Sequence, residues 1–580
     1  MKLTNKILTT IILVLSITGC SSFLDEELQY THEEEVLESG IRSRGILDDI
    51  YTDYSFRYFT DFGIEYLTDN GVLNSSETNL VTNNWGPTNN PLSYVWQQSY
   101  NNIRVVYQYI ELVHNSGLPY LPSEASADLN DAVIQRYYGE AHFLKAWAQW
   151  ELLKVFGGPG EDGTMLGFPI IDGILENEDY ASISRNTFQE CVDQIMADLD
   201  VAIENLPLIY SGTENIEAGI NLGTAANETG RASGLAAYAL KAKLALFAAS
   251  PAFNPNNDIT KWELAATLAS EVIEQNGGLK SLQAYDFDRE NNPDHIWRMR
   301  NSRQNNSLEL RLYPPTLYGQ GEVNPSQNLI DAFPDSNGYP IDNASSAYNE
   351  ASPYASRDDR FYKFIFYNGD RCFTSETCSD YNPIETFQGG QDNFGGFIPN
   401  EGTRTGYYLK KFLNNLNFDP SEEDRVTTLP KVYVQLGLTD IYLSYAEAAN
   451  EAYGPEIIPA GLNFSAKDVL SRVRSRAGIN TDNYLNEVSA SQSDFRALLK
   501  NERRIELCFT GERFHDLRRW KDITNIEDLE GVQISKNSDD TFTYNTIEVE
   551  RRSFETKNYY LPLPYDELQL NKNLEQNQGW

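Results

Sequence analysis

The chain has 580 residues, of which 41% are hydrophobic and 22% charged, and its formal net charge is −38. This composition excludes an intrinsically disordered chain, because it supplies enough apolar surface to build a large core. A surface this acidic repels phosphate backbones, so we expect no nucleic-acid partner and consider a neutral ligand a better fit.

The first twenty residues resemble the export signal of a bacterial lipoprotein. Lys2 and Lys6 precede an apolar run over residues 7–17, which is too short to span a bilayer stably but suits a secretory signal. The run ends in the tetrapeptide ITGC, which resembles a lipobox whose cysteine is acylated. We therefore expect a signal peptide over residues 1–19 and a lipid anchor on Cys20. An ordinary secretory signal with a nearby cysteine is the alternative.

The mature chain is expected to reach the membrane through its lipid anchor only. No other stretch approaches the roughly 18 consecutive apolar residues that a spanning helix requires. The sequence therefore predicts a body that folds in water and is held at the membrane by lipid.

A polar stretch rich in Asn, Gly and Pro, residues 69–93, separates two segments with helical periodicity. Loops of this length inside a compact chain are usually functional. We therefore expect part of a ligand-binding surface here, although an aromatic ring in such a loop could instead fill the core beneath it. The candidate ligand-binding residues in and beside this stretch are Asp69, Asn83, Asn84, Trp85 and Tyr94.

Three segments have apolar residues at helical spacing, with small residues among them. Between Tyr137 and Leu152 they recur every three or four positions, and a glycine pair from Gly157 would end this helix. Residues 235–249 and 262–273 repeat the pattern, and a short loop between them predicts an antiparallel hairpin. Four tryptophans on helical periods, in these segments or in the one that begins near Tyr94, are expected to pack in the core: Trp96, Trp147, Trp150 and Trp262.

Between residues 281 and 430 no long helical period survives, and Asn, Asp, Gly, Pro and Tyr dominate. We expect this insertion to complete the ligand-binding surface, with Trp297 and Tyr318 as further candidate contacts. It also contains the closely spaced cysteines Cys372 and Cys378. An oxidising cell envelope would permit a disulfide between them, with two free thiols as the alternative. A zinc site would need two more ligands close by, and the sequence offers none.

The C-terminal part returns to helical patterns. Ser465 and Asp468 have the spacing of a capping box at a helix start. In the stretch 501–520, charged and apolar residues alternate, and Glu502 and Glu506 fall on one helical face. We expect this helix to end at Thr510-Gly511, and the charges to form a paired network that fixes the last helices. Buried ions are tolerated only when they are paired.

Together the segments predict a mostly α fold. Small residues such as Ala allow helices to approach closely, as in tetratricopeptide-like hairpins. We therefore predict irregular helical-hairpin repeats with long, loop-rich insertions, in one body over residues 20–580. Its expected parts are an N-terminal half with the first repeat helices and the binding loop (20–230) and a repeat hairpin (231–280). A loop-rich insertion (281–430) and the C-terminal repeat helices with a tail (431–580) follow.

An ordered set of motifs along nearly the whole chain resembles one known family. The motifs include CSSFLDEE from Cys20, WQQSYNNIRVVYQYI from Trp96, GRASGLAAYALKAKLALFAASP, NPSQNLIDAF from Asn324, TGYYLKKF from Thr405, YLSYAEAANEAYGP and the closing YYLPLPYDELQLNKNLEQNQGW. They are similar to the SusD/RagB-like outer-membrane nutrient-binding lipoproteins of the Bacteroidetes. Each motif alone is weak, but their order along the chain is specific.

The resemblance implies a fold, a location and a role. The body would be SusD-like, exposed at the cell surface and anchored in the outer membrane through Cys20. It would capture an oligosaccharide or polysaccharide and deliver it to a TonB-dependent, SusC-like transporter, without enzymatic activity. A peptide-binding, RagB-like member of the same family is the alternative.

The sequence offers little support for catalysis or cofactors. None of its five histidines has the spacing of a zinc hydrolase or the context of a catalytic triad. No nucleotide-binding fingerprint is present, and no EF-hand spacing supports calcium, although loop Asp residues could hold it. A cryptic glycoside hydrolase needs only two carboxylates, so it stays a weaker alternative. With 35 Tyr and 8 Trp, the composition favours stacking on the faces of a neutral sugar.

Overall fold

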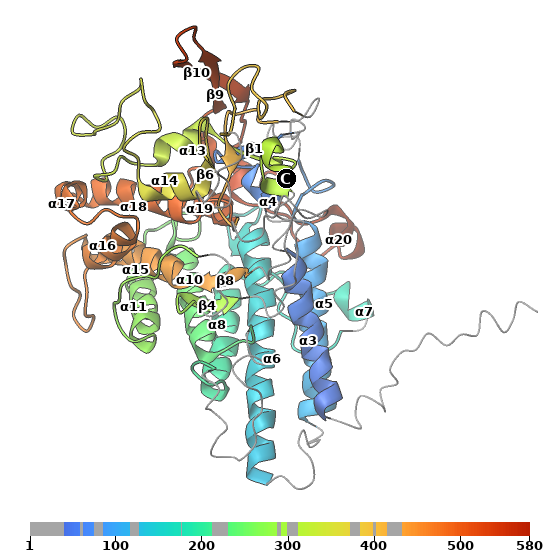
Figure 1. Cartoon of the computed structure of the whole chain (residues 1–580). Coiled ribbons are helices and arrows are strands. Elements are labelled where there is room, and N and C mark those ends of the chain that lie inside the picture. Colours follow the sequence, from blue (N-terminus) through green and yellow to red (C-terminus); the bar gives the residue numbers. More distant parts are fainter. Residues whose placement is uncertain are drawn as a thin grey trace, which may run out of the picture.

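A computed structural model describes residues 40–57, 62–74, 85–115, 127–175, 177–210, 230–286, 292–298, 311–371, 383–397, 402–413 and 432–580. Helices dominate these ranges, as predicted, and strands occur there only as short pairs (Figure 1). Within the same ranges no helix is both long enough and apolar enough to cross a membrane. The predicted residues that lie outside the described ranges are Cys20, Asn83, Asn84, Cys372 and Cys378.

The N-terminal half is built on long helices that lie side by side (Figure 1). They are α3 (Gly40–Arg57), α5 (Tyr94–Tyr109) with its π-helical continuation η2 (Ile110–His114), α6 (Ala127–Phe156) and α8 (Phe188–Asn205). Helix α6 ends directly before Gly157, as predicted, and the Gly157 N–H donates to the carbonyl of Leu153. The four tryptophans assigned to packing are all buried, which confirms that prediction.

The helical hairpins of the repeat frame are present. They comprise α10 (Gly234–Ala249) with α11 (Ile259–Gln275), and α15 (Leu438–Tyr453) with α16 (Ala466–Arg476). Helix α10 is buried along its whole length except at Tyr238 and Lys241, because it lies among α8, α11 and α15. The small Ala side chains of α10 allow this close approach on several sides. The tetratricopeptide-like character of the repeat stays a prediction.

The last helices are α17 (Asn483–Val488), α18 (Gln492–Glu506) and α19 (Glu512–Arg519). Helix α18 ends at Glu506, so the predicted end at Thr510-Gly511 was four residues too late. The chain leaves the helix earlier because Phe509 takes a left-handed backbone conformation, with φ of 59°. Gly511, with φ of 84°, then starts α19.

The other elements are short. The helices are α4 (Phe62–Glu65), α7 (Asn177–Tyr180), α13 (Gln327–Ala332), α14 (Asp359–Phe364) and α20 (Tyr565–Leu570), with 3₁₀ turns η3 (Pro315–Leu317), η5 (Ile523–Asn525) and η6 (Thr556–Tyr559). The antiparallel strand pairs are β1 (Gly71–Leu73) with β5 (Val323–Pro325), β2 (Gly158–Pro159) with β3 (Met165–Leu166), β4 (His295–Arg298) with β8 (Val434–Gly437), β6 (Ile365–Phe366) with β7 (Tyr408–Leu409), and β9 (Leu529–Lys536) with β10 (Phe542–Glu550). Strand β8 leads directly into α15, so the β4–β8 pair ties the loop-rich part to the helical frame.

The described apolar side chains form two separate cores. The larger core unites the helices of the frame, from α3 to α19. The smaller core lies in the loop-rich part, mostly over residues 312–413, and the C-terminal end of α18 joins it through Ile505, Cys508 and Phe509. The segment that connects α18 and α19 therefore sits where the helical frame meets the loop-rich part.

The stretch 501–520 fixes this junction through paired buried charges. Arg519 binds Glu447 at 2.6 Å and Asp516 at 2.8 Å. Arg360 of α14 binds Glu502 at 2.7 Å, and all of these side chains are buried. The predicted paired network is confirmed, and it connects α18 and α19 to α15 on one side and to the loop-rich part on the other.

Candidate ligand-binding cavity

Two of the predicted ligand-binding residues, Trp85 and Trp297, are core residues. The Trp85 ring is 3% exposed and lies 5.2 Å from the ring of Trp580. Trp297 is also 3% exposed, lies 4.6 Å from Trp147, and donates from Nε1 to the carbonyl of Gly230 at 3.0 Å. A ring with both faces covered by protein has no face left for a sugar. The stacking role expected of these two residues does not fit their burial.

Asp69 is held inside the protein by two arginines. Its carboxylate accepts two hydrogen bonds from Arg513, at 2.9 and 2.8 Å, and lies 3.0 Å from Arg504. Burial alone would raise the pKa of Asp69, but these two guanidinium groups outweigh it and hold the pKa below its ordinary value. The geometry gives Asp69 a structural role, because its two arginine partners connect the segment after α4 to α18 and α19.

Tyr94 and Tyr318 are the predicted aromatics that reach the surface. Tyr94 is 40% exposed and Tyr318 is 41% exposed. Tyr94 lines a cavity with aromatic walls at the junction of the two cores, whereas Tyr318 does not. Tyr318 lies instead in a turn after η3, with a left-handed φ of 64°. Among the predicted residues that the structure describes, Tyr94 is therefore the one that belongs to the cavity.

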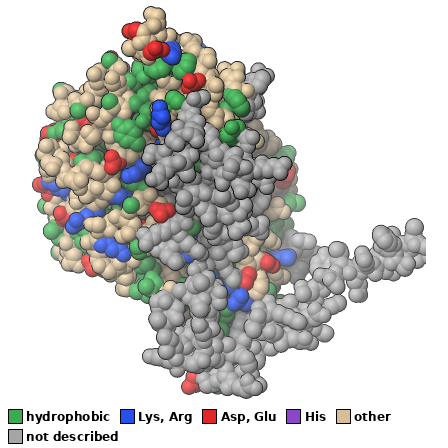
Figure 2. Space-filling model, viewed as in Figure 1, with side chains coloured by type: hydrophobic (Ala, Val, Ile, Leu, Met, Phe, Trp, Pro, Cys, Tyr) green, Lys and Arg blue, Asp and Glu red, His purple; other side chains and the backbone are tan. Residues whose placement is uncertain are grey.

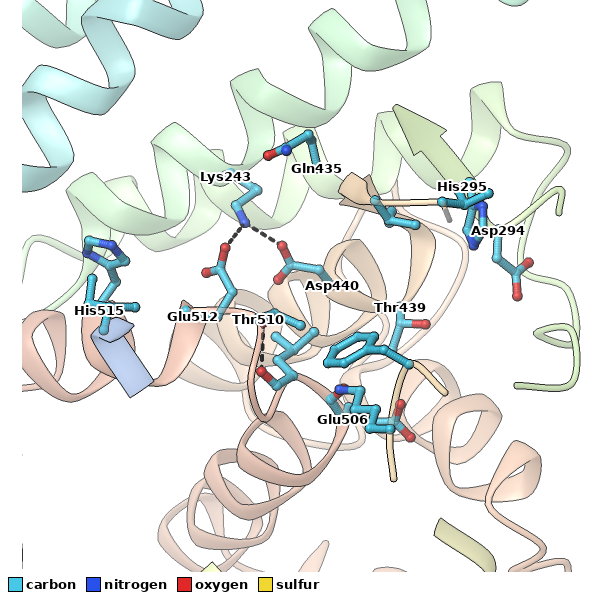
Figure 3. Close-up of a pocket in the computed structure, with 18 of the residues that line it drawn as sticks. Lys243, Asp294, His295, Gln435, Thr439, Asp440, Glu506, Thr510, Glu512 and His515 are labelled. Carbon is cyan, nitrogen blue, oxygen red and sulfur yellow. Dashed lines mark hydrogen bonds and ion pairs between the residues drawn. The ribbon is translucent and has the colours of Figure 1, made fainter. Parts of the chain in front are cut away.

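This cavity has a volume of about 220 Å³ and lies at the junction of the two cores. Its walls come from α6, α10, the start of α15, the α18–α19 connection and the segments around β4 and β8. Figure 3 shows Lys243, Asp440 and Glu512 turned toward one another from three different helices. Its aromatic lining residues are Tyr94, Trp147, Trp150, Tyr285, Phe364 and Phe412. A concave site with aromatic walls and a few polar groups is typical of small-molecule binding.

A lysine between two carboxylates is the central polar feature. Lys243 of α10 lies 2.6 Å from Asp440 and 2.8 Å from Glu512 (Figure 3). Asp440 also accepts a hydrogen bond from Arg503 at 3.1 Å. Burial alone would raise the pKa of Asp440, but Lys243 and Arg503 lower it to about 2. Asp440 therefore stays ionised at any ordinary pH.

Every basic side chain on the cavity wall is already bonded within the protein. Besides Lys243, Lys154 pairs with Glu151 at 2.7 Å, and Arg476 pairs with Glu506 at 2.6 Å. Lys411 donates at 2.8 Å to each of the carbonyls of Glu506 and Cys508. The acidic residues on the same wall outnumber these four cations: Glu151, Asp286, Asp294, Asp440, Glu506 and Glu512.

Two histidines on the wall carry no charge. Burial lowers the pKa of His295 to about 4, and the nearby Arg298 contributes in the same direction. Burial also lowers the pKa of His515 well below its ordinary value, and the positive charges of Lys154, Arg518 and Lys243 add to the effect. Both imidazoles are therefore neutral hydrogen-bonding groups and not cations.

The cavity provides no evident catalytic chemistry. A glycosidase needs one carboxylic acid that donates a proton, and this requires a raised pKa. Asp440 has the opposite shift, and Lys243 bridges it to Glu512. In the described part of the chain no cluster of three or more His, Cys, Asp or Glu could hold a metal ion. The arrangement can bind and orient a polar molecule.

No strong sequence signal marks Lys243, Asp440, Glu512 and His515. Lys243 lies in an Ala-rich segment whose pattern indicates helix packing, and a lysine inside such an apolar pattern is the available clue. Its partners Asp440 and Glu512 are about 200 and 270 positions away in the sequence. Only the packing of α10, α15 and α19 brings them together.

Comparison with known proteins supports the fold and identifies the family. The SusD-like protein P25 of Formosa agariphila is 22% identical over 505 residues, which cover 83% of this chain and 77% of that protein. A crystal structure of a SusD-like protein from Bacteroides fragilis matches with a TM-score of 0.70 and 23% identity, covering 93% of this chain and 97% of that one. A protein described as a laminarin-binding SusD-like protein matches with a TM-score of 0.58 and 19% identity, over 93% of this chain and 99% of its own.

Two family models match complementary parts of the chain. One, described as starch-binding and associating with the outer membrane, matches residues 22–246. The other, described as the SusD family, matches residues 282–580, which is more than half of the chain. The chain therefore belongs to the SusD family, a family of carbohydrate-binding proteins that are not enzymes.

Proposed function

We propose that this protein is a cell-surface lipoprotein, anchored in the outer membrane through Cys20, which captures a neutral oligosaccharide or polysaccharide. Its cavity at the junction of the two cores binds the sugar. The protein then delivers the sugar to a TonB-dependent, SusC-like transporter in the same membrane. The family membership and the laminarin-binding relative support the ligand class, and the lipobox-like sequence supports the anchor.

The observation that carries this proposal is the combination of groups on the cavity wall. Aromatic rings such as Tyr94 offer apolar faces, and carboxylates and neutral imidazoles offer hydrogen-bonding partners for hydroxyl groups. The wall cations are bonded within the protein, so an anionic sugar would find acidic groups without a free positive partner. On the face shown in Figure 2, basic and acidic side chains are interspersed over the described surface.

Affinity electrophoresis against neutral polysaccharides tests the proposal. The wild-type protein should be retarded in gels that contain at least one of them, such as laminarin or starch. Tyr94→Ala should reduce the retardation, because it removes an exposed ring from the cavity. Tyr318→Ala is the matched control, since this ring is equally exposed but lies outside the cavity.

The outcomes separate the alternatives. Loss of retardation with Tyr318→Ala but not with Tyr94→Ala would place the binding surface at the turn after η3. Absence of retardation on every polysaccharide, together with binding of peptides, would overturn the glycan proposal in favour of a peptide-binding member.

Fatty-acid labelling of the wild type, and its loss in Cys20→Ser, tests the anchor. Co-purification of a TonB-dependent transporter in mild detergent tests the partner.

A further inference from the structure

We infer that Glu512 is the carboxylate that accepts the hydrogen bond of a sugar hydroxyl in the cavity, and that Lys243 acts as its positioning residue. This inference rests on the proposed function, because it assigns the contact within the same cavity. It also specifies the ligand further: a sugar that presents a hydroxyl group here binds, and one that presents a carboxylate is rejected.

The Lys243 ammonium holds Glu512 in a fixed place. Glu512 is the first residue of α19, and the left-handed Gly511 before it sets the direction in which the helix starts. The Gly511 N–H is in turn fixed by the buried carboxylate of Glu65 at 2.9 Å. Lys243 reaches Glu512 from α10, on the other wall of the cavity (Figure 3). Backbone and side chain of Glu512 are thus both restrained before any ligand arrives.

Glu512 is the most accessible of the ion-paired carboxylates on the wall. Its side chain is 27% exposed, whereas Glu151 is 12%, Asp440 is 9% and Glu506 is 2% exposed. Glu506 is bonded to Arg360 and Arg476 as well as Tyr285. Among the residues that the structure describes, Glu512 has one side-chain partner, Lys243, which it meets through Oε1 alone. Its carboxylate therefore has acceptor capacity left for a ligand.

Unpaired polar atoms on the same wall independently indicate a site for a polar ligand. His515 lies three residues after Glu512, on the same face of α19, and its Nδ1 is buried without a hydrogen-bond partner among the described residues. Elsewhere on the cavity lining, Oδ1 of Asp294 is likewise buried with no partner in the described part of the chain. Such atoms are costly in a folded protein, so each of them calls for a partner such as a ligand or an ordered water. His515 is 9% exposed and Asp294 is 5% exposed.

The charge of the ion-pair network around Lys243 explains the expected rejection of acidic sugars. Lys243, Arg503 and Arg519 bring three positive charges to four connected carboxylates, so the network keeps a net negative charge; the carboxylates are Glu512, Asp440, Asp516 and Glu447. A uronate carboxylate beside Glu512 would meet this charge in a partly buried place, where like charges repel strongly. A hydroxyl group meets no such penalty and donates a charge-assisted hydrogen bond.

Calorimetric titration of four variants tests the assignment. The probes are a hexasaccharide cut from whichever neutral polysaccharide retards the wild type, and the same hexasaccharide oxidised at C6 to the uronate. Glu512→Gln should weaken binding of the neutral probe about 10- to 100-fold, the expected loss for a hydrogen bond to a charged group. Lys243→Met should weaken binding similarly, and Lys243→Arg should restore most of it. Lys241→Met is the matched control, because Lys241 lies on the same helix as Lys243 but outside the cavity, where it pairs with Asp200 of α8.

The wild type should bind the oxidised probe at least about 10-fold more weakly than the neutral probe, and Glu512→Gln should narrow this difference. Unchanged affinity in Glu512→Gln, with the wild type binding the neutral probe, would overturn the assignment while the proposed function stands. A wild type that binds no neutral probe would overturn the proposed function, and the assignment with it. Melting curves of each variant verify that the fold is intact. If Lys243→Met does not fold, the affinity of Lys243→Arg for the neutral probe tests the positioning role of Lys243.

Discussion

At the scale of single residues, the protein places many ionisable groups in its interior and pairs them. Burying an ion is costly unless a partner and hydrogen bonds compensate, and removing one partner leaves the other charge unpaired. Glu447 illustrates the arrangement, because it accepts two hydrogen bonds from Arg519 and one from the Trp520 indole, all at 2.6 to 2.7 Å. Such groups determine how the helices fit together, and they do not form a catalytic site.

Glu447→Ala should lower the free energy of unfolding by about 3–5 kcal/mol, because it leaves the Arg519 guanidinium buried with less compensation. Urea denaturation checks this. Glu451→Ala is the matched control, one turn further along α15, since Glu451 pairs with the part-exposed Arg496. A surface pair of this kind contributes about 0–1 kcal/mol. Equal effects of the two substitutions would contradict the role given to the buried network.

The buried carboxyl group of Glu65 should make the free energy of unfolding depend on pH. Burial raises the pKa of Glu65 from 4.5 to about 7, although hydrogen bonds from Asn70 and Gly511 oppose the shift. The folded state then holds this proton more tightly than the unfolded state does. Glu65 therefore contributes about 3 kcal/mol to the free energy of unfolding below pH 4.5. This contribution is lost as the pH rises from 4.5 to about 7.

Glu65→Gln should remove this contribution, because an amide keeps an acceptor for the Gly511 N–H and does not titrate. Denaturation at pH 5 and pH 8 gives the comparison. Between these two values the wild type should lose more stability than the variant. The same loss in both proteins would show that Glu65 does not titrate in this range.

At the scale of elements, local signals at helix ends are as informative as the apolar pattern. Ser465 caps α16: its hydroxyl accepts from the Asp468 N–H at 3.1 Å, and Asp468 accepts from the Ser465 N–H at 2.9 Å. Ser465→Ala should cost about 1 kcal/mol and speed amide hydrogen exchange in the first turn of α16. Ser471→Ala, in the same helix but exposed, should leave that exchange unchanged. Equal protection in Ser465→Ala would contradict the capping role.

The sequence predicted the long helices and their ends well, because their signals are local. The stop of α6 before Gly157 and the capping box of α16 depend on residues close in the chain. The end of α18 was misplaced, because the left-handed turn at Phe509 depends on packing in the second core, which no local pattern encodes.

The site was less predictable, because exposure in a loop has no periodic signal. Trp85 was expected at the surface, but its neighbour is Trp580, at the other end of the chain. Trp297 is covered by Trp147 of α6 in the same way. Tyr94 reaches the surface, and its expected ligand contact stays a prediction. The cavity it lines is completed by residues of packed helices and of the loop-rich part, which no single local pattern marks.

At the scale of the whole molecule, the cavity lies where two cores meet. The helical frame supplies α6, α10 and α15 as rigid walls, and the loop-rich part supplies the opposite side through Tyr285, Phe364 and Phe412. The α18–α19 connection belongs to both and carries Glu512 between them. The shape of a cavity at such a junction depends on long-range packing.

The crystal structure of the protein with a bound neutral hexasaccharide, chosen by the electrophoresis, tests the central claim most directly. The account predicts a sugar ring in the cavity, with a hydroxyl within about 3 Å of the Glu512 carboxylate and a ring face near Tyr94. A hexasaccharide that lies elsewhere on the protein, for instance across Tyr318, with the Lys243–Glu512 pair untouched, would contradict it.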